Sequence, residues 1–244
     1  MNKNRFDISS AGLHMLAMGF MLCDHLWGTI VPGNDWLTCI GRLAFPIFAF
    51  MIVEGYTHTS NLKRYALRLL AFALISELPF NLMVGSRLFF PIHQNVLWTF
   101  LIGLGLIHWN ERAKEFPLWR RVLRLAASVI LGALVGTVAF VDYSGAGVLT
   151  VLVFYVFRER KWWCLLGQIA ALYYINVELL SGLAYEVELF GRTFWLTQQG
   201  LALLALIPIW LYRGRRGCNS RAFRWLCYGF YPAHMLLLAL MKML

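Results

Sequence analysis

Charged residues are scarce in this sequence. Only 14% of its 244 residues are Asp, Glu, Lys or Arg, whereas 60% are hydrophobic. Soluble domains average about 25% charged and about 45–50% apolar residues. The composition therefore excludes an ordinary soluble domain and is typical of a membrane protein.

Other features are missing as well. The five cysteines form no Cys-x-x-Cys pair, so we expect buried free thiols and no metal site. The chain has no low-complexity segment, long linker or internal repeat, which predicts a single integral-membrane domain over residues 1–244. The polar residues 1–10 precede an apolar run without a small-residue cleavage site, so we expect that run to remain as a helix.

The long apolar runs predict an all-α, polytopic bundle of about nine transmembrane helices, since about 20 apolar residues cross the hydrocarbon core. The fourth and sixth runs are short, and the sixth is expected to be tilted or re-entrant. The expected spans are residues 11–31, 36–56, 65–84, 95–109, 122–141, 145–157, 162–180, 193–212 and 223–243.

Basic residues concentrate at the N-terminus and in the loops after spans two, four, six and eight. The opposite loops and the C-terminal end hold only Arg87, Arg192 and Lys242. This asymmetry predicts a cytosolic N-terminus and an outer C-terminus. It also explains the net charge of +10 without nucleic-acid binding, which we do not expect.

The first span carries one acidic side chain and two histidines. Burying the Asp24 carboxylate alone costs about 2.5–3.5 kcal/mol, so this group marks a candidate functional site. On a helix, His14 and His25 project within roughly 20° of each other and lie about 16 Å apart along the axis. Asp24 points about 100° away from His25, so we expect it to serve as a counter-ion for a neighbouring helix, with Arg42 the first candidate.

The second and third spans add further charges. Arg42 and Glu54 lie inside the second span, and the anion for Arg42 is expected to be Asp24 or Glu77. Pro46 cannot donate to the Arg42 carbonyl, so we predict a kink at Pro46. A structural ion pair of Arg42 with Glu77 is the alternative to a functional role.

Other histidines have simpler interpretations. We expect His234 to bond a carbonyl freed by the nearby Pro232. His93 and His108 are expected to lie at the membrane interface. For His14 an interfacial position is the alternative to a functional role.

Several ordered motifs then carry a resemblance that runs over most of the chain. They are Leu13 to His25, Gly41-Arg42-Leu43-Ala44-Phe45-Pro46-Ile47-Phe48-Ala49-Phe50, Glu54-Gly55-Tyr56-Thr57-His58-Thr59, Tyr65 with Arg68-Leu69, Ser76-Glu77-Leu78-Pro79-Phe80, Gln94-Asn95-Val96, Asp142-Tyr143, Gln198, Pro208-Ile209, Leu211-Tyr212-Arg213-Gly214, Phe230-Tyr231-Pro232 and His234-Met235. By these motifs the sequence resembles the TraX family of membrane proteins.

The resemblance implies a function and a location. The family is named for a conjugation protein that N-acetylates pilin, and it looks related to transmembrane acyltransferases such as acyltransferase type 3 and heparan acetyltransferase proteins. Type 3 proteins carry a basic residue, ten intervening residues and a histidine, and His14 and His25 have that spacing, with His14 in place of the usual Lys or Arg. The bacterial inner (cytoplasmic) membrane is the expected location.

The implied donor is cytosolic acetyl-CoA, with no metal. Arg64, Arg68 and protonated His14 are expected to line a cytosolic mouth for its phosphates, because Arg binds phosphate bidentately. The acyl arm then extends inward to His25. The acceptor stays open: pilin or another peptide, a glycan or a lipid, with an amine or a hydroxyl as the acylated group.

The expected chemistry uses few side chains. His25 is predicted to act as general base or transient acyl carrier, since neutral imidazole suits both roles. Arg42 or Asn95 is expected to stabilise the tetrahedral oxyanion. Asp24 or Glu77 balances Arg42.

Two alternatives stay open. A transporter also uses broken helices and charges at mid-membrane, but no repeat between the halves supports it. A non-catalytic membrane component of a conjugation or secretion assembly explains the basic loops but not the embedded charges.

Overall fold

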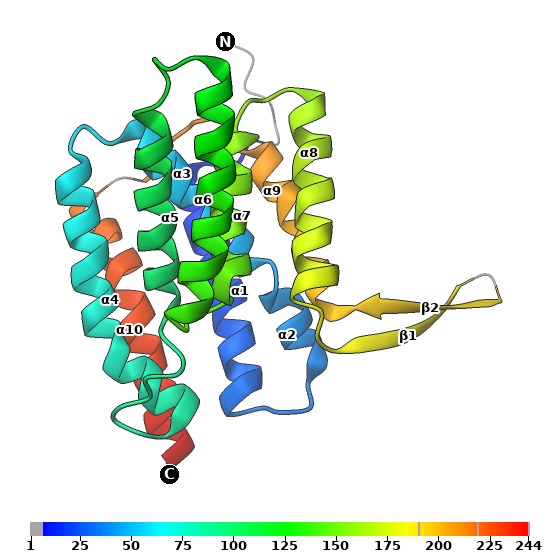
Figure 1. Ribbon diagram of the computed structural model, residues 1–244. Helices are drawn as coiled ribbons and strands as arrows, with labels where there is room; N and C mark the ends of the chain where they lie inside the picture. The colour runs from blue at the N-terminus through cyan, green and yellow to red at the C-terminus, as the bar shows by residue number, and fades with distance from the viewer. Residues whose placement is uncertain (1–6, 190, 219, 244) are drawn as a thin grey trace. The chain divides into compact units, whose positions relative to one another are not determined.

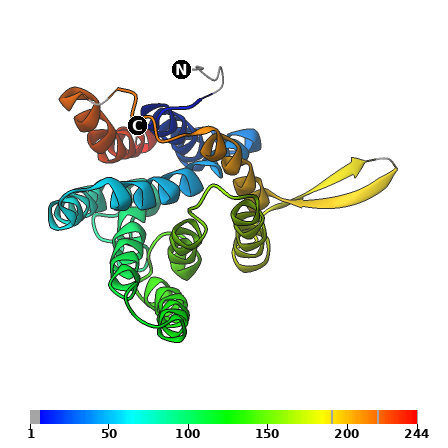
Figure 2. The same cartoon turned by 90° about the horizontal axis from the view of Figure 1, so that it is seen from above.

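The computed structural model describes residues 7–189, 191–218 and 220–243, and it is mostly helical (Figure 1; Figure 2). The chain groups into two compact units. The first unit comprises residues 1–51 and 176–244, and the second comprises residues 52–175. The prediction that both work as one membrane domain stays a prediction.

Four helical segments of the described chain are long and apolar enough to cross a membrane. Two shorter apolar helical segments cover Ser144–Val156 and Gln198–Leu211. The chain is therefore a helical membrane protein. The four long segments are Asp35–His58, Leu62–Gly85, Leu118–Val138 and Arg221–Met243.

The first unit is organised around α1 (Ser10–Thr29), which packs against α2 (Asp35–Gly41) and α10 (Arg221–Met243). The Ser9 hydroxyl caps α1 by accepting from the Gly12 N–H at 3.1 Å. One continuous helix therefore carries His14, Asp24 and His25, as the apolar run from residue 11 to 31 predicts.

The predicted second span is interrupted. It divides into α2 and α3 (Ala44–His58), with Arg42 and Leu43 between them. Pro46 is the third residue of α3, where its missing N–H has no partner within the helix in any case. The kink predicted at Pro46 is therefore wrong in position, because the break lies just before α3 and the proline fits into its first turn.

The predicted eighth span begins instead with a β-hairpin. Strand β1 (Ala184–Leu189) pairs antiparallel with β2 (Arg192–Thr197), with Tyr185 opposite Leu196, and the hairpin projects from the first unit (Figure 1). The run from Thr193 to Thr197 contains two aromatic and two β-branched residues, which favours a strand, and Gly191 near the turn has φ +72°. The all-α expectation is therefore wrong for residues 184–197.

The remaining elements of the first unit are short. A π-helical turn, η1 (Tyr174–Leu179), leads toward the hairpin from α8. After the hairpin follow a 3₁₀ helix, η2 (Gln198–Ala205), and α9 (Leu206–Leu211). Helical structure of the eighth span is thus confined to residues 198–211.

The second unit follows the predicted spans closely. Its helices are the end of α3, then α4 (Leu62–Gly85), α5 (Val96–Glu111), α6 (Leu118–Val138), α7 (Ser144–Val156) and α8 (Trp162–Tyr173). Helices α6 and α7 approach closely: a Cβ added to Gly145 would lie 2.4 Å from the Ala133 carbonyl oxygen. Small residues at such crossings are typical of helices packed in membranes.

Candidate functional site

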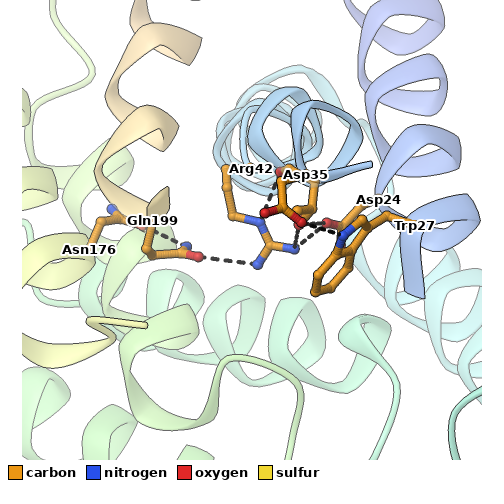
Figure 3. A network of polar contacts seen from close by, with 7 residues as sticks. Asp24, Trp27, Asp35, Arg42, Asn176 and Gln199 are labelled. Carbon is orange, nitrogen blue, oxygen red and sulfur yellow. Dashed lines mark hydrogen bonds and ion pairs between the residues drawn. The ribbon is translucent and has the colours of Figure 1, made fainter. Parts of the chain in front are cut away.

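The first unit contains an ion pair between α1 and the end of α2. The Arg42 guanidinium contacts the Asp24 carboxylate, and their side chains are 17% and 21% exposed (Figure 3). The Thr38 hydroxyl donates to Asp24 Oδ1 at 2.6 Å, and Arg42 Nη2 donates to the Thr38 hydroxyl at 3.1 Å. The pair expected between Asp24 and Arg42 is present, because an embedded Arg needs an anion.

Two amides extend this network from the far end of the sequence. Arg42 Nη1 donates to Gln199 Oε1 at 3.1 Å, and Gln199 Nε2 donates to Asn176 Oδ1 at 3.0 Å (Figure 3). Both amides are buried, with 7% and 2% of their surface exposed. Gln199 and Asn176 were not predicted from the sequence, although polar amides inside apolar segments could have indicated them. The network therefore fixes the guanidinium from two sides.

Gly41 permits the close approach of α2 to α1. A Cβ at this position would lie 2.4 Å from Asp24 Cβ, closer than such atoms approach. The residue before Arg42 is therefore glycine because the ion pair requires α2 to contact the Asp24 turn of α1 directly.

His25 contacts α10 rather than α2. Its Nδ1 lies 2.7 Å from His234 Nε2, while His234 Nδ1 lies 2.7 Å from the Phe230 carbonyl oxygen. His234 is buried, with 5% of its surface exposed. The expected bond of His234 to a carbonyl left by Pro232 is therefore wrong, because the carbonyl four residues before Pro232 is that of Tyr228, whereas His234 bonds that of Phe230. Asp24 and His25 thus contact different helices, as their directions on α1 predict.

The two imidazoles meet edge to edge. Their planes differ by only 9° and their centroids lie 4.9 Å apart. This is nearly the longest centroid separation that a 2.7 Å contact between ring nitrogens allows, so the nitrogens lie almost on the line that joins the rings. The Phe230 ring stacks on His234, with centroids 4.6 Å apart. The pair therefore has the in-plane geometry of an N–H···N hydrogen bond.

His14 lies near the start of the same helix. Its Nδ1 lies 3.0 Å from the Ser10 carbonyl oxygen. Its ring lies edge-on to the ring of Phe223 of α10, with ring centroids 6.4 Å apart. The spacing of His14 and His25 on one helix is as predicted. A role for His14 in binding phosphate stays a prediction.

Glu77, in the second unit, has a different environment. Its Oε2 accepts from Asn95 Nδ2 and from Trp98 Nε1, the latter at 3.1 Å. Asn95 is fully buried, donates to the Ala73 carbonyl and caps α5 by accepting from the Leu97 N–H at 3.1 Å. Because the Asn95 amide is used in these contacts, a structural role is favoured for Asn95. Arg42 is therefore the stronger candidate for stabilising an oxyanion.

The remaining predicted site residues also belong to the second unit. Glu54 lies 3.6 Å from the His58 imidazole, one turn later on α3. Arg64 and Arg68 are exposed in the first two turns of α4, which Asn61 caps. Their binding roles stay predictions.

His93 has an anionic partner beside the Glu77 region. Its Nε2 lies 3.2 Å from Asp142 Oδ1, in the loop before α7. The hydrogen bond with Asp142 raises the pKa of His93 above its ordinary value, although burial opposes this shift. His93 thus lies in a loop and forms an ion pair with Asp142, and its predicted position at the membrane interface stays a prediction.

Comparison with known proteins shows which family this sequence belongs to. Residues 9–242 match the family model described as TraX protein. The probable fimbrial assembly protein FimC, serogroup H1, of Dichelobacter nodosus is 27% identical over 256 residues, which cover 100% of this chain and 99% of that protein. Protein TraX of Escherichia coli is 27% identical over 142 residues, 57% of this chain and 52% of that protein. No solved structure matches the chain.

Proposed function

The chain belongs to the TraX family, and we propose that it is a membrane-embedded acyltransferase that serves a pilus or conjugation assembly. It would move an acetyl group from acetyl-CoA to an acceptor amine or hydroxyl. The observation that carries this proposal is the in-plane pair of His25 and His234, placed one residue from a fixed ion pair. A positioned imidazole is the commonest general base in enzymes.

The side chains of the first unit divide the work. His25 takes the proton of the acceptor. The positive charge of Arg42 stabilises the negative charge that develops on the acetyl oxygen. Asp24, Thr38 and Gln199 hold the guanidinium, so it does not need to reorganise during the reaction.

The donor phosphates require a separate basic surface. We propose that Arg64 and Arg68, exposed on one face of α4, bind them. Replacing both arginines with Gln is expected to raise the KM for acetyl-CoA with little effect on kcat, since they contact a part of the donor remote from the reacting atoms.

Orientation in the membrane is part of the same proposal. Nine crossings, with the N-terminus in the cytosol and the C-terminus outside, put the basic loops and this phosphate surface on the cytosolic side. Alkaline phosphatase fusions test this topology: fusions after Arg87 and Arg192 should be active, and fusions after Lys63 and Lys114 inactive. Activity of the Lys63 fusion would overturn the orientation.

The enzymatic proposal is tested with purified protein in nanodiscs and radiolabelled acetyl-CoA. Ethanolamine and glycerol serve as amine and hydroxyl probes. The wild type should release CoA and label at least one probe or water, His25→Ala should lose this activity, and the exposed His58→Gln should retain it. A wild type that neither binds nor cleaves acetyl-CoA overturns the proposal, and full activity of His25→Ala removes His25 from it.

A second function has its own support. The Dichelobacter nodosus relative that aligns over the whole chain is named as a probable fimbrial assembly protein. The alternative is therefore a non-catalytic membrane component of such an assembly. Restoration of pilus assembly in a deletion strain by His25→Ala protein would favour this alternative over the enzyme.

A further inference from the structure

The hydrogen bond of His234 to the backbone determines where its proton lies. Its Nδ1 is 2.7 Å from the Phe230 carbonyl oxygen, which can only accept. His234 Nδ1 must therefore carry a hydrogen. In a neutral imidazole the other nitrogen is then an acceptor, so His234 Nε2 presents a lone pair.

This lone pair in turn determines the tautomer of His25. His25 Nδ1 lies 2.7 Å from His234 Nε2, and two lone pairs would repel at that distance, so His25 Nδ1 must donate. The base of the neutral ring is then Nε2. We infer that His234 is a positioning residue, which holds His25 with a proton on Nδ1 and a lone pair on Nε2. Its catalytic meaning rests on the proposed acyltransferase function.

The surroundings make this arrangement rigid. Phe230 stacks on one face of His234 and Tyr231 lies beside the ring, both on the same helix α10. The almost linear N–H···N hydrogen bond fixes the orientation of the His25 ring relative to His234. Within the described residues His25 Nε2 makes no hydrogen bond, so it remains the nitrogen that can receive a proton.

The pair also gives the incoming proton a second position. As the acceptor nitrogen or oxygen bonds to the acetyl carbon, its proton goes to His25 Nε2. The Nδ1 proton of His25 can then move to His234 Nε2, which places the positive charge beside the Phe230 carbonyl. When the carbon–sulfur bond of acetyl-CoA breaks, the protons shift back and the sulfur takes the proton from His25 Nε2.

The tautomer is measured directly by nitrogen-15 NMR of histidine-labelled protein in nanodiscs, with the His25 signals assigned by their loss in His25→Ala. The spectrum is recorded at a pH where His25 is neutral. In the wild type, His25 should show a protonated Nδ1 and an unprotonated Nε2. A protonated Nε2 in the neutral wild type overturns the inference, whether or not the protein transfers acetyl groups.

Variants of His234 separate positioning from folding. His234→Ala should shift His25 toward a mixture that contains the Nε2-protonated tautomer. His234→Gln should restore the Nδ1–H form, because the Gln oxygen can accept from His25 Nδ1. An unchanged His25 tautomer in folded His234→Ala protein would contradict the inference.

Kinetics then connect the tautomer to the reaction. His234→Ala should lower kcat about 10²-fold, the lower range for general-base catalysis, with an unchanged KM for acetyl-CoA. His234→Gln should recover a large part of kcat, and His58→Gln should change neither constant. Wild-type protein with the predicted tautomer but no acetyl transfer would refute the proposed function and leave the positioning of His25 intact. Equal kcat values for wild type and His234→Ala would refute the catalytic importance of His234.

Discussion

The two units hold their embedded carboxylates in opposite ways. In the first unit, Asp24 faces a guanidinium that two further elements hold in place, whereas Glu77 in the second unit accepts from the neutral amide of Asn95 and the indole of Trp98. An ion pair keeps a full positive charge inside the protein, while neutral donors only satisfy the carboxylate. The first unit thus keeps a full charge pair at the residue that precedes His25, whereas the Glu77 cluster connects α4 to α5.

The strongest test of this comparison is to remove the positive charge. Arg42→Met leaves the Asp24 carboxylate with the Thr38 hydroxyl as its remaining partner in this network. Breaking a buried pair costs about 3–5 kcal/mol, and we expect about 3 kcal/mol here because both side chains remain partly exposed. Thermal unfolding in detergent, followed by tryptophan fluorescence, measures the loss.

The matched control is the double variant Asp24→Asn, Arg42→Met. It removes both charges, so it should be clearly more stable than Arg42→Met alone. If the single and double variants unfold at the same temperature, the cost does not come from an unpaired Asp24 carboxylate.

Close packing at Gly41 gives the next largest effect. Gly41→Ala places a Cβ 2.4 Å from Asp24 Cβ, so α2 must move away from α1 and the ion pair must loosen. Overpacking of this kind costs about 1–3 kcal/mol. Gly28→Ala on α1 is the control, because nothing lies within 4 Å of its Cβ, and it should be neutral or stabilising by up to about 1 kcal/mol. Equal unfolding temperatures for the two variants would show that Gly41 does not limit the approach of the helices.

The helices and the Asp24–Arg42 pair were predictable from sequence for simple reasons. Apolar runs of membrane length indicate helices, and an embedded Arg requires an anion that a neighbouring span can supply. The hairpin was not predictable in this way, because the run of Phe194, Trp195 and Leu196 is apolar enough to pass for the start of a span.

The partner of His25 lay beyond sequence reasoning. His234 is 209 residues away, and only the packing of α10 against α1 brings the two rings together. The position of the break in the second span was also missed, since the effect of Pro46 depends on whether it falls in the middle or in the first turn of a helix. Sequence thus indicates which groups are embedded, but the helix packing decides which of them meet.

The neutral cluster of the second unit predicts a small response. In Glu77→Gln the amide oxygen can still accept from Asn95 and Trp98, so only the strengthening by charge is lost. We expect the unfolding free energy to change by no more than about 1 kcal/mol. A loss as large as that of Arg42→Met, measured in the same thermal assay, would show that the Glu77 charge is as important to its unit as the Asp24 charge is to the first.

The smallest expected effect comes from the histidine–carboxylate pair of the second unit, His93 with Asp142. An arginine guanidinium stays protonated at every working pH, so the charge of Arg42 itself does not change near neutrality. The pKa of His93 is raised from 6.5 by its hydrogen bond with Asp142, with burial opposing and Glu77 adding to the increase. A histidine whose pKa is raised in the folded state stabilises the fold fully below pH 6.5. This stabilisation is lost as the pH rises through the pKa of the folded state.

The unfolding temperature should therefore fall slightly as the pH rises above 6.5. We expect the unfolding free energy to decrease by only about 0.5 kcal/mol, because the His93 side chain is 38% exposed. Asp142→Asn should flatten this part of the pH profile, and Asp24→Asn should not. A slope that persists in Asp142→Asn but disappears in Asp24→Asn would reverse the comparison, since the titrating pair would then belong to the first unit.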